Sequence, residues 1–176
     1  LDTDDWWLRN KIKKQIQLYY KKKNAKLIYC NCYLYNQKNK KNKLFVKNKL
    51  PEGKVTQELL NNYSVGLLTI LVKKDVFANQ SFSNKLNIIG DFDFVIRLSK
   101  KEKFACVQEP LAYYRQHGKN YSEKNSKLYM SEIKNWLKAN KADLTKKGFS
   151  LKTQEILLKK LQIKNYLKKI TNIIPF

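Results

Sequence analysis

The chain has 176 residues, with 37 lysine and arginine residues against 14 aspartate and glutamate residues, and a formal net charge of +23 at pH 7. This length suits one medium-sized domain. Its 43% hydrophobic and 12% aromatic content excludes a chain kept disordered by its charge. No uncharged apolar window approaches the roughly 18 residues of a membrane-spanning helix, so none is expected.

The positive charge is almost entirely lysine, because Arg9, Arg97 and Arg115 are the only arginines. Lysine together with many Asn, Ile and Tyr residues is typical of AT-rich coding, which favours solvated lysine faces over a dedicated polyanion site. Nucleic acid or an anionic membrane surface is the alternative partner. Because lysine is the usual cation of this chain, the three arginines indicate places where a planar guanidinium that pairs through two hydrogen bonds is needed.

The three cysteines, Cys30, Cys32 and Cys106, lie in apolar runs and are odd in number. This pattern predicts no disulfide framework and favours a reducing compartment. We interpret the cysteines as small core residues, because too few partners accompany Cys30 and Cys32 for a metal site.

The predicted elements begin with Leu1, interpreted as the end of a hydrophobic strand. A helix is expected from Trp7, because apolar residues recur there at helical spacing: Leu8, Ile12, Ile16 and Tyr19. Lys26 to Tyr35 alternates with apolar residues on both faces, which predicts a strand inside a sheet.

The middle of the chain predicts shorter elements. In chain order they are a polar turn at Gln37–Lys43, a strand at Leu44–Val46, a helix at Thr56–Asn62, a strand at Leu67–Lys73 and a short helix at Lys74–Phe77. A helix from Gly90 to about Lys100 follows, and then two strands at Phe104–Val107 and Leu111–Gln116.

Two lysine-rich amphipathic helices, Glu123–Lys141 and Leu151–Lys169, are expected after Ser122. Mixed strands and helices followed by helices alone predict an α/β core over 1–122 with a helical appendage over 123–176.

Five of the 14 acidic residues fall in two short clusters, and the first is Asp2-Thr3-Asp4-Asp5. Clustered carboxylates repel one another unless a hard cation lies between them, and Mg²⁺ or Mn²⁺ holding a diphosphate satisfies that arrangement. An acidic turn, with Asp5 as a helix N-cap, is the simpler alternative.

The second cluster, Gly90-Asp91-Phe92-Asp93, opens a predicted helix. Arg97 lies four residues after Asp93, so these two side chains can pair along one helix face. Asp91 is then left as the available carboxylate. Helix capping is again the alternative.

The only histidine, His117, follows Arg115 near the end of a predicted strand. Alternate residues of a strand point to the same side, so these two side chains are expected to do so. A lone histidine is more often structural than a ligand, but this one lies where a loop begins.

Taken in order, three segments resemble the family 2 glycosyltransferases, which have the GT-A nucleotide-sugar-binding fold. The resemblance covers roughly residues 1–122. It rests on Leu1-Asp2-Thr3-Asp4-Asp5-Trp6-Trp7-Leu8 with Lys11 and Lys14-Gln15, on Gly90-Asp91-Phe92-Asp93 with Ile96-Arg97-Leu98, and on Glu109-Pro110-Leu111-Ala112-Tyr113-Tyr114-Arg115-Gln116-His117-Gly118 with Asn120 and Ser122.

The resemblance implies roles for particular residues. Asp2 and Asp4 match the D-x-D motif that binds metal and diphosphate, and Asp5 is the adjoining carboxylate. Asp91 matches the general base of inverting members, although the family usually has Glu where this chain has Gly90. Arg115 and His117 match a loop that closes over the donor, where they would reach the diphosphate or the metal.

The activity implied is transfer of a hexose from a nucleotide-diphosphate sugar to an acceptor hydroxyl, in cell-surface polysaccharide or glycan synthesis. The expected cofactor is Mn²⁺ or Mg²⁺, and the expected acceptor is a saccharide or a lipid-linked molecule. No nucleic-acid partner is expected. The implied location is cytoplasmic. The two C-terminal helices could lie on anionic lipid at the inner membrane face, although lysines that flank a packed helix look identical in sequence.

The resemblance begins at the D-x-D motif, whereas family members begin with βαβ units that bind the base and the ribose. We therefore expect this chain to be a fragment of a GT-A domain, lacking the N-terminal nucleotide-binding half and inactive alone. The sequence leaves two other classes open: a basic nucleic-acid- or membrane-surface-binding module without catalysis, and a phosphatase or nuclease with a carboxylate-held metal.

Overall fold

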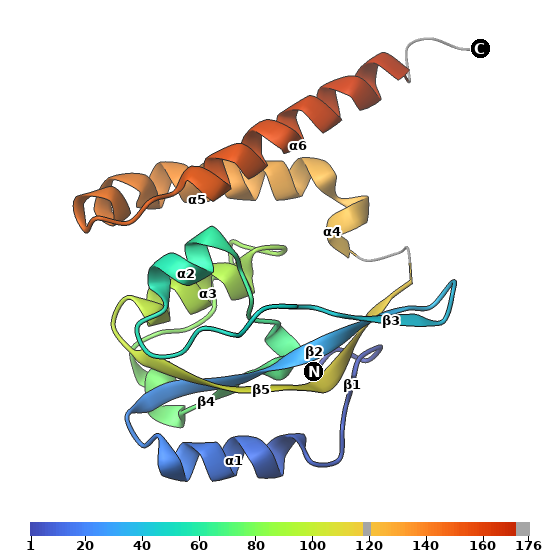
Figure 1. The fold of residues 1–176 in the computed structure, drawn as a ribbon. Helices are drawn as coiled ribbons and strands as arrows, with labels where there is room; N and C mark the ends of the chain where they lie inside the picture. Colours follow the sequence, from blue (N-terminus) through green and yellow to red (C-terminus); the bar gives the residue numbers. More distant parts are fainter. Residues whose placement is uncertain (118–120, 172–176) are drawn as a thin grey trace.

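The computed structural model of the chain describes residues 1–117 and 121–171. It is a mixed α/β fold built on one five-stranded sheet with helices on both faces. Helix α1 covers one face, and α2 and α3 cover the other, with α5 and α6 stacked beyond them (Figure 1).

The sheet is mixed, with the strand order β1-β5-β2-β3, and β4 also pairs with β2. The pairing of β2 with β5 is parallel and the other pairings are antiparallel. The strands are β1 (Trp6–Trp7), β2 (Ala25–Asn36), β3 (Lys41–Leu44), β4 (Leu71–Val72) and β5 (Lys103–Gln116).

Six α-helices and two short 3₁₀ helices lie in the described residues. The α-helices are α1 (Lys11–Lys21), α2 (Thr56–Asn61), α3 (Gly90–Ser99), α4 (Tyr121–Lys124), α5 (Ser126–Lys146) and α6 (Lys152–Thr171). The 3₁₀ helices span Leu67–Thr69 and Lys74–Ala78.

Strand β2 is covered on both faces, as its apolar pattern predicts. Leu27 and Tyr29 belong to the main core on the side of α2 and α3. Ile28 points to the opposite face, where Leu18 and Tyr19 of α1 pack against it. A central strand with this environment needs apolar side chains at successive positions, because neither face meets water.

The structure differs from the helix predicted from Trp7 in two respects: the residue at which the helix begins and the face that it buries. Trp6–Trp7 forms β1 against β5, and α1 begins only at Lys11. The buried residues of α1 are Lys11 and Gln15, whereas Ile12 and Ile16 are exposed.

A cluster of polar contacts explains why α1 buries Lys11 and Gln15 and exposes Ile12 and Ile16. The Gln15 amide donates to the carbonyl oxygens of Ile28, at 3.2 Å, and Thr69, at 2.7 Å. Lys11 Nζ donates to Gln15 Oε1 at 2.8 Å and lies 4.2 Å from the centroid of the Trp7 ring. Buried polar groups are retained where they find such partners.

Strand β5 is continuous from Lys103 to Gln116, so the predicted break at Glu109-Pro110 is wrong. Pro110 stands opposite Asn31, where the register between β2 and β5 shifts. The irregularity accommodates a residue that has no backbone N–H to donate.

Three other predicted strands differ from the structure. Leu67–Lys73 contributes only the two residues of β4, preceded by a 3₁₀ helix, and the predicted strand at Leu44–Val46 lies instead at Lys41–Leu44. Leu1 is exposed and lies in no strand, because the Asp5 N–H bonds to the Asp2 carbonyl and closes a turn there.

The C-terminal helices share the main hydrophobic core with the sheet and α3. Ile133, Trp136 and Leu144 of α5 and Leu161 of α6 belong to the same cluster as Phe92. Division of the chain into a core over 1–122 and an appendage over 123–176 stays a prediction. Within the described residues, no helix is both long enough and apolar enough to span a bilayer.

Candidate functional site

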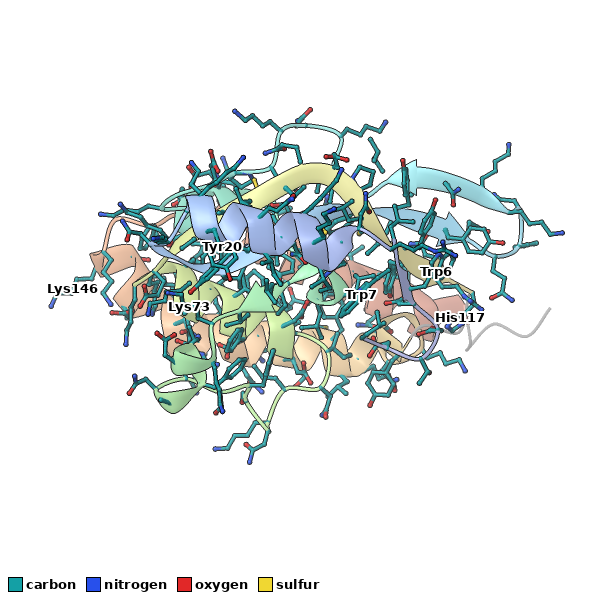
Figure 2. The ribbon with its side chains drawn as sticks, turned by 90° about the horizontal axis from the view of Figure 1, so that it is seen from below. Trp6, Trp7, Tyr20, Lys73, His117 and Lys146 are labelled. Atoms are coloured by element: carbon teal, nitrogen blue, oxygen red, sulfur yellow. The ribbon has the colours of Figure 1, made fainter. Side chains whose placement is uncertain are left out.

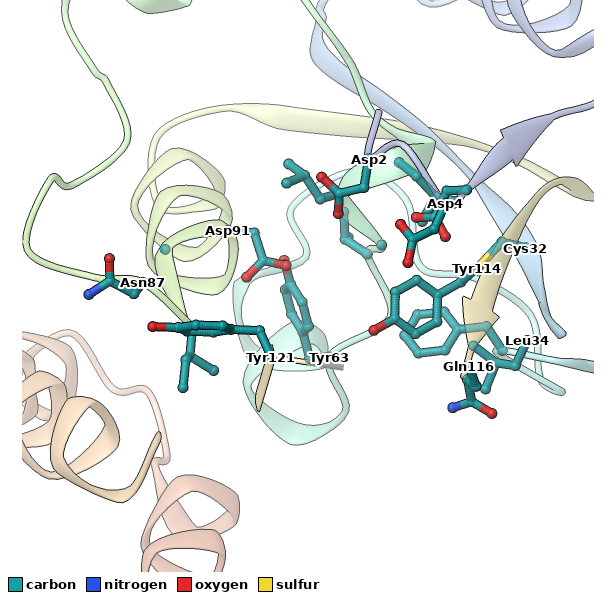
Figure 3. Close-up of a pocket in the computed structure, with 18 of the residues that line it drawn as sticks. Asp2, Asp4, Cys32, Leu34, Tyr63, Asn87, Asp91, Tyr114, Gln116 and Tyr121 are labelled. Atoms are coloured by element: carbon teal, nitrogen blue, oxygen red, sulfur yellow. The ribbon is translucent and has the colours of Figure 1, made fainter. Parts of the chain in front are cut away.

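A cavity of about 770 Å³ lies beside the C-terminal end of β5. The two acidic clusters and the histidine meet there, because its lining includes Asp2, Asp4, Asp5, Asp91 and His117. Figure 3 shows Asp2 and Asp4 on the N-terminal segment and Asp91 at the start of α3, all facing this space. The fold thus unites residues that are about 90 positions apart in the chain.

The N-terminal segment presents three carboxylates as one group. One oxygen from each of Asp2, Asp4 and Asp5 lies within 4.8 Å of the others. The segment is fixed at its C-terminal side by β1, whose Trp6 pairs with Tyr113 of β5. Figure 2 shows Trp6 and Trp7 at the same end of the molecule as His117, away from Tyr20 and Lys73.

His117 contacts the acidic group directly. Its Nε2 lies 2.9 Å from Oδ2 of Asp4, and both side chains are partly exposed. A carboxylate beside an imidazole orients the ring and fixes which nitrogen carries a proton.

Asp5 is partly buried and held by the backbone of β5. Its Oδ1 accepts the Arg115 N–H at 2.9 Å. Burial raises the pKa of Asp5, the Arg115 N–H opposes that rise, and the charges of Asp4 and Asp2 add to it. A cation beside the three carboxylates would relieve this repulsion.

The side chain of Arg115 lies apart from this group. Its guanidinium stands 5.3 Å from the centroid of the Trp6 ring, and Trp6 stacks on Tyr113 at 4.7 Å. Tyr114, Gln116 and His117 line the cavity, whereas Arg115 is not among its lining residues. Alternation within β5 turns Tyr114 and Gln116 toward the cavity and Arg115 away from it. His117 lies just beyond the last residue of β5 and lines the cavity, so the expectation that Arg115 and His117 point to the same side is wrong. A role for Arg115 in binding the donor stays a prediction.

Asp91 forms the wall of the cavity at the start of α3, next to Tyr63. The Tyr63 hydroxyl donates to Asp91 Oδ2 over 3.4 Å. Burial raises the pKa of Asp91 and outweighs the hydrogen bonds from the Phe92 N–H and Tyr63, which lower it. A carboxylate whose pKa is raised by its surroundings is a stronger base.

Asp93 is occupied by other contacts, as the spacing to Arg97 predicts. Arg97 Nε donates to Asp93 Oδ2 at 2.8 Å, and Trp136 Nε1 donates to Asp93 Oδ1 at 3.0 Å. Both carboxylate oxygens of Asp93 are therefore engaged, and Asp91 is the carboxylate of this cluster that lines the cavity.

The segment before α3 is held by Glu132 of α5, which sequence reasoning missed. Its carboxylate accepts the backbone N–H groups of Asn87, Ile88 and Ile89 at 2.8, 2.9 and 3.1 Å. Glu132 is buried, and it is one of only two acidic residues in α5. Acidic residues are rare in this lysine-rich chain. The same rarity that singled out the aspartates could have singled out Glu132.

The cysteines are free and buried, as predicted for small core residues. Cys32 lines the cavity, and burial raises the pKa of its thiol to about 12. Burial also raises the pKa of Cys30 and of Cys106 to about 11. Thiols of this kind stay protonated at neutral pH and are poor nucleophiles.

The donor set of the cavity suits a hard divalent cation, since it offers three carboxylates and a neighbouring imidazole within one concave site. Asp91 on the facing wall suits proton abstraction from a bound hydroxyl. Aromatic side chains from distant parts of the chain also line the space: Phe45, Tyr63, Phe82, Tyr114 and Tyr121.

No protein-family model matches the chain, and no curated protein sequence matches it significantly.

Proposed function

We propose that this chain is part of a glycosyltransferase of the family 2 type, which moves a sugar from a nucleotide-diphosphate donor to an acceptor hydroxyl with inversion. The observation that carries the proposal is the meeting of the Asp2, Asp4 and Asp5 group with Asp91 in one cavity. Transfer of this kind needs both a site for the diphosphate and a separate base. A mixed sheet flanked by helices agrees with an assignment to the GT-A fold.

Asp2, Asp4 and Asp5 would hold a Mg²⁺ or Mn²⁺ ion, with His117 as a further ligand. When bound, the ion supplies positive charge that stabilises the leaving diphosphate. The hydrogen bond from the backbone N–H of Arg115 keeps the Asp5 carboxylate beside those of Asp2 and Asp4.

Asp91 takes the proton of the acceptor hydroxyl as its oxygen attacks the anomeric carbon. The bond from that carbon to the donor's diphosphate oxygen breaks, and the diphosphate leaves with the bonding electrons. Tyr63 orients Asp91 through its hydroxyl, and Glu132 fixes the preceding backbone. The aromatic lining provides apolar faces against which sugar rings can stack.

The proposed partners are a nucleotide-diphosphate sugar and a saccharide or lipid-linked acceptor. The proposed process is the synthesis of cell-surface polysaccharide or glycan. The proposed location of the enzyme is the cytoplasm. The free, buried cysteines agree with a reducing compartment.

The test is calorimetric binding of uridine and guanosine diphosphates to the 176-residue chain, with and without Mn²⁺. We expect binding through the diphosphate alone, dependent on Mn²⁺. Asp4→Asn should weaken it at least tenfold, whereas the control Asp75→Asn, at an exposed aspartate paired with Lys26, should leave it unchanged. Asp91→Asn should retain binding.

Sugar transfer to a saccharide acceptor is then measured for the parent and for Asp91→Asn wherever transfer by the parent is detectable, and the variant should show none. Equal binding with and without Mn²⁺ would contradict the proposal. Hydrolysis of simple phosphodiesters with no requirement for a sugar nucleotide would favour a metal-dependent phosphatase or nuclease instead.

A further inference from the structure

Helix α6 carries apolar side chains on two opposite faces. Leu157 and Leu161 face α5 and the main core. Ile156 and Ile163, seven residues apart and hence on one stripe of the helix, point the other way and are 43% and 60% exposed. Tyr166, one turn beyond Ile163, is 65% exposed. A helix that is apolar on both faces is normally covered on both.

The exposed stripe lies among lysines. Lys152, Lys159 and Lys160 are exposed and lie one helical turn from Ile156 or Ile163. The helix holds six lysines and a single glutamate, Glu155, which is already paired with Lys141 of α5 at 2.7 Å. The surface around the stripe is therefore strongly cationic.

The position of α6 leaves this stripe accessible to a large flat partner. Figure 1 shows α6 as the outermost element on its side of the molecule, crossing α5 and extending beyond it, with the sheet and α1 on the far side. The apolar face and the lysines consequently lie at one extremity of the molecule.

We infer that the outer face of α6, defined by Ile156, Ile163 and Tyr166 with Lys152, Lys159 and Lys160, docks on an anionic lipid bilayer. Lysines at the level of the headgroups pair with lipid phosphates, while the apolar side chains enter the boundary of the acyl chains. Each lysine near such a surface strengthens binding about fivefold.

Other partners fit the face less well. A second copy of the chain would bring two lysine-rich faces together without carboxylates to pair them. A nucleic acid would satisfy the lysines but would offer no apolar interior to the isoleucines. An anionic bilayer provides both chemistries in one continuous surface.

The test is co-sedimentation of the full chain with vesicles of phosphatidylglycerol and phosphatidylcholine in equal parts, and with vesicles of phosphatidylcholine alone. We expect binding to the anionic vesicles that weakens with salt. The variant I156Q/I163Q should bind at least about tenfold more weakly. Its control, I12Q/I16Q, removes the same side chains from α1, where they are 37% and 40% exposed, and should bind like the parent.

A second pair of variants separates charge from apolar contact. K159Q/K160Q should lose at least about tenfold in binding, whereas K13Q/K21Q, which removes two exposed lysines of α1, should lose much less. All four pairs replace exposed side chains, and unchanged thermal unfolding confirms that they fold.

Three outcomes would overturn the inference. The parent stays in the supernatant with anionic vesicles, the α1 and α6 variants lose binding equally, or sedimentation equilibrium shows a dimer that I156Q/I163Q converts to monomer. None of these results bears on nucleotide binding in the cavity, so the inference and the proposed transferase activity stand or fall separately.

Discussion

The hydroxyl of Tyr63 donates to the carboxylate of Asp91 across 3.4 Å, at the point where α3 meets the cavity. Burial, together with the charge of Asp91, raises the pKa of Tyr63 well above its ordinary value of 10.0. The phenol therefore stays protonated at neutral pH and always acts as the donor. Burial raises the pKa of Asp91 and this hydrogen bond moderates the rise, so the pair together sets the basicity of the carboxylate.

Replacement of Tyr63 by phenylalanine should raise the pKa of Asp91 further, because the ionised carboxylate loses a hydrogen bond. Titration of the Asp91 carboxyl carbon by nuclear magnetic resonance measures the change. Tyr129→Phe is the matched control, because Tyr129 lies near Asp91 and no hydrogen bond joins the two in the described part of the chain. Equal titration of Asp91 in the parent and in Tyr63→Phe would refute the role assigned to the phenol.

Replacement of Asp91 by asparagine should stabilise the protein at neutral pH. The pKa of Asp91 is higher in the folded chain than its ordinary 3.8, so the folded state holds its proton more tightly. Stability from this group is fully present below pH 3.8 and is lost as the pH rises through the folded pKa.

The side chain of asparagine does not ionise, so Asp91→Asn does not lose stability as the pH rises. Its midpoint of thermal unfolding should exceed that of the parent by a few degrees at neutral pH, since about 1 kcal/mol corresponds to roughly 2–4 °C for a chain of this size. The difference should shrink toward pH 3.8. A variant less stable than the parent at neutral pH would show that Asp91 is stabilised by its surroundings when ionised.

Glu132 should be among the most sensitive positions for stability. Glu132→Ala leaves three backbone N–H groups without their acceptor and should lower the free energy of unfolding by about 3 kcal/mol or more. Glu132→Gln keeps one acceptor oxygen and should cost about 1–2 kcal/mol. Urea unfolding measures both against Lys134→Ala, an exposed change on the same helix. Similar values for all three variants would contradict the role of Glu132.

The long strand β2 and the helix α3 could be predicted from local pattern, whereas the short strands β1, β3 and β4 could not. The apolar run of β2 and the apolar spacing of α3 describe elements that are buried as their patterns require. Prediction was less successful at the N-terminal helix. There Ile12 and Ile16 imitate a core face, but a hydrogen-bonded pair, Lys11 and Gln15, occupies it instead. Periodicity records where apolar residues recur and says nothing of buried polar partners.

The candidate site shows the same division. The scarcity of carboxylates identified the aspartates that line the cavity, and spacing alone predicted the Asp93–Arg97 pair. Tyr63 gave no signal, because a single tyrosine among 11 carries no pattern. Its partnership with Asp91 depends on the packing of α2 against α3, which is a tertiary contact.

The buried Lys11 offers a test of how the chain tolerates a cation in its interior. Burial lowers the pKa of Lys11, and none of the ion pairs among residues 1–117 and 121–171 includes it. Because the folded pKa is lower than the unfolded value, stability from this group increases as the pH rises through the folded pKa toward 10.5.

Lys11→Met should remove that alkaline gain and stay within about 1 kcal/mol of the parent at neutral pH, because an apolar side chain of similar length fills the same space. Urea unfolding at neutral and alkaline pH measures both effects. The exposed Lys13→Met is the control and should keep the pH dependence of the parent. A loss of several kcal/mol in Lys11→Met at neutral pH would mean that the hydrogen bond to Gln15 and the contact with Trp7 outweigh the desolvation of the ammonium.

Mn²⁺ should raise the midpoint of thermal unfolding of the parent chain, and a chelator should reverse the rise. An ion that binds only the folded state at a concentration of 100 times its dissociation constant contributes about 2.7 kcal/mol. For a chain of this size that corresponds to roughly 5–11 °C.

The double variant Asp2→Asn/Asp4→Asn should abolish the rise, because it removes two of the three carboxylates that converge within 4.8 Å. Asp75→Asn, at an exposed carboxylate outside the group, should show the full effect of the parent. Scanning calorimetry with and without the metal gives all three values. If the double variant gained as much as the parent, Mn²⁺ would be acting elsewhere on the surface. The cluster would then be an acidic turn whose carboxylates contact His117 and the backbone of β5.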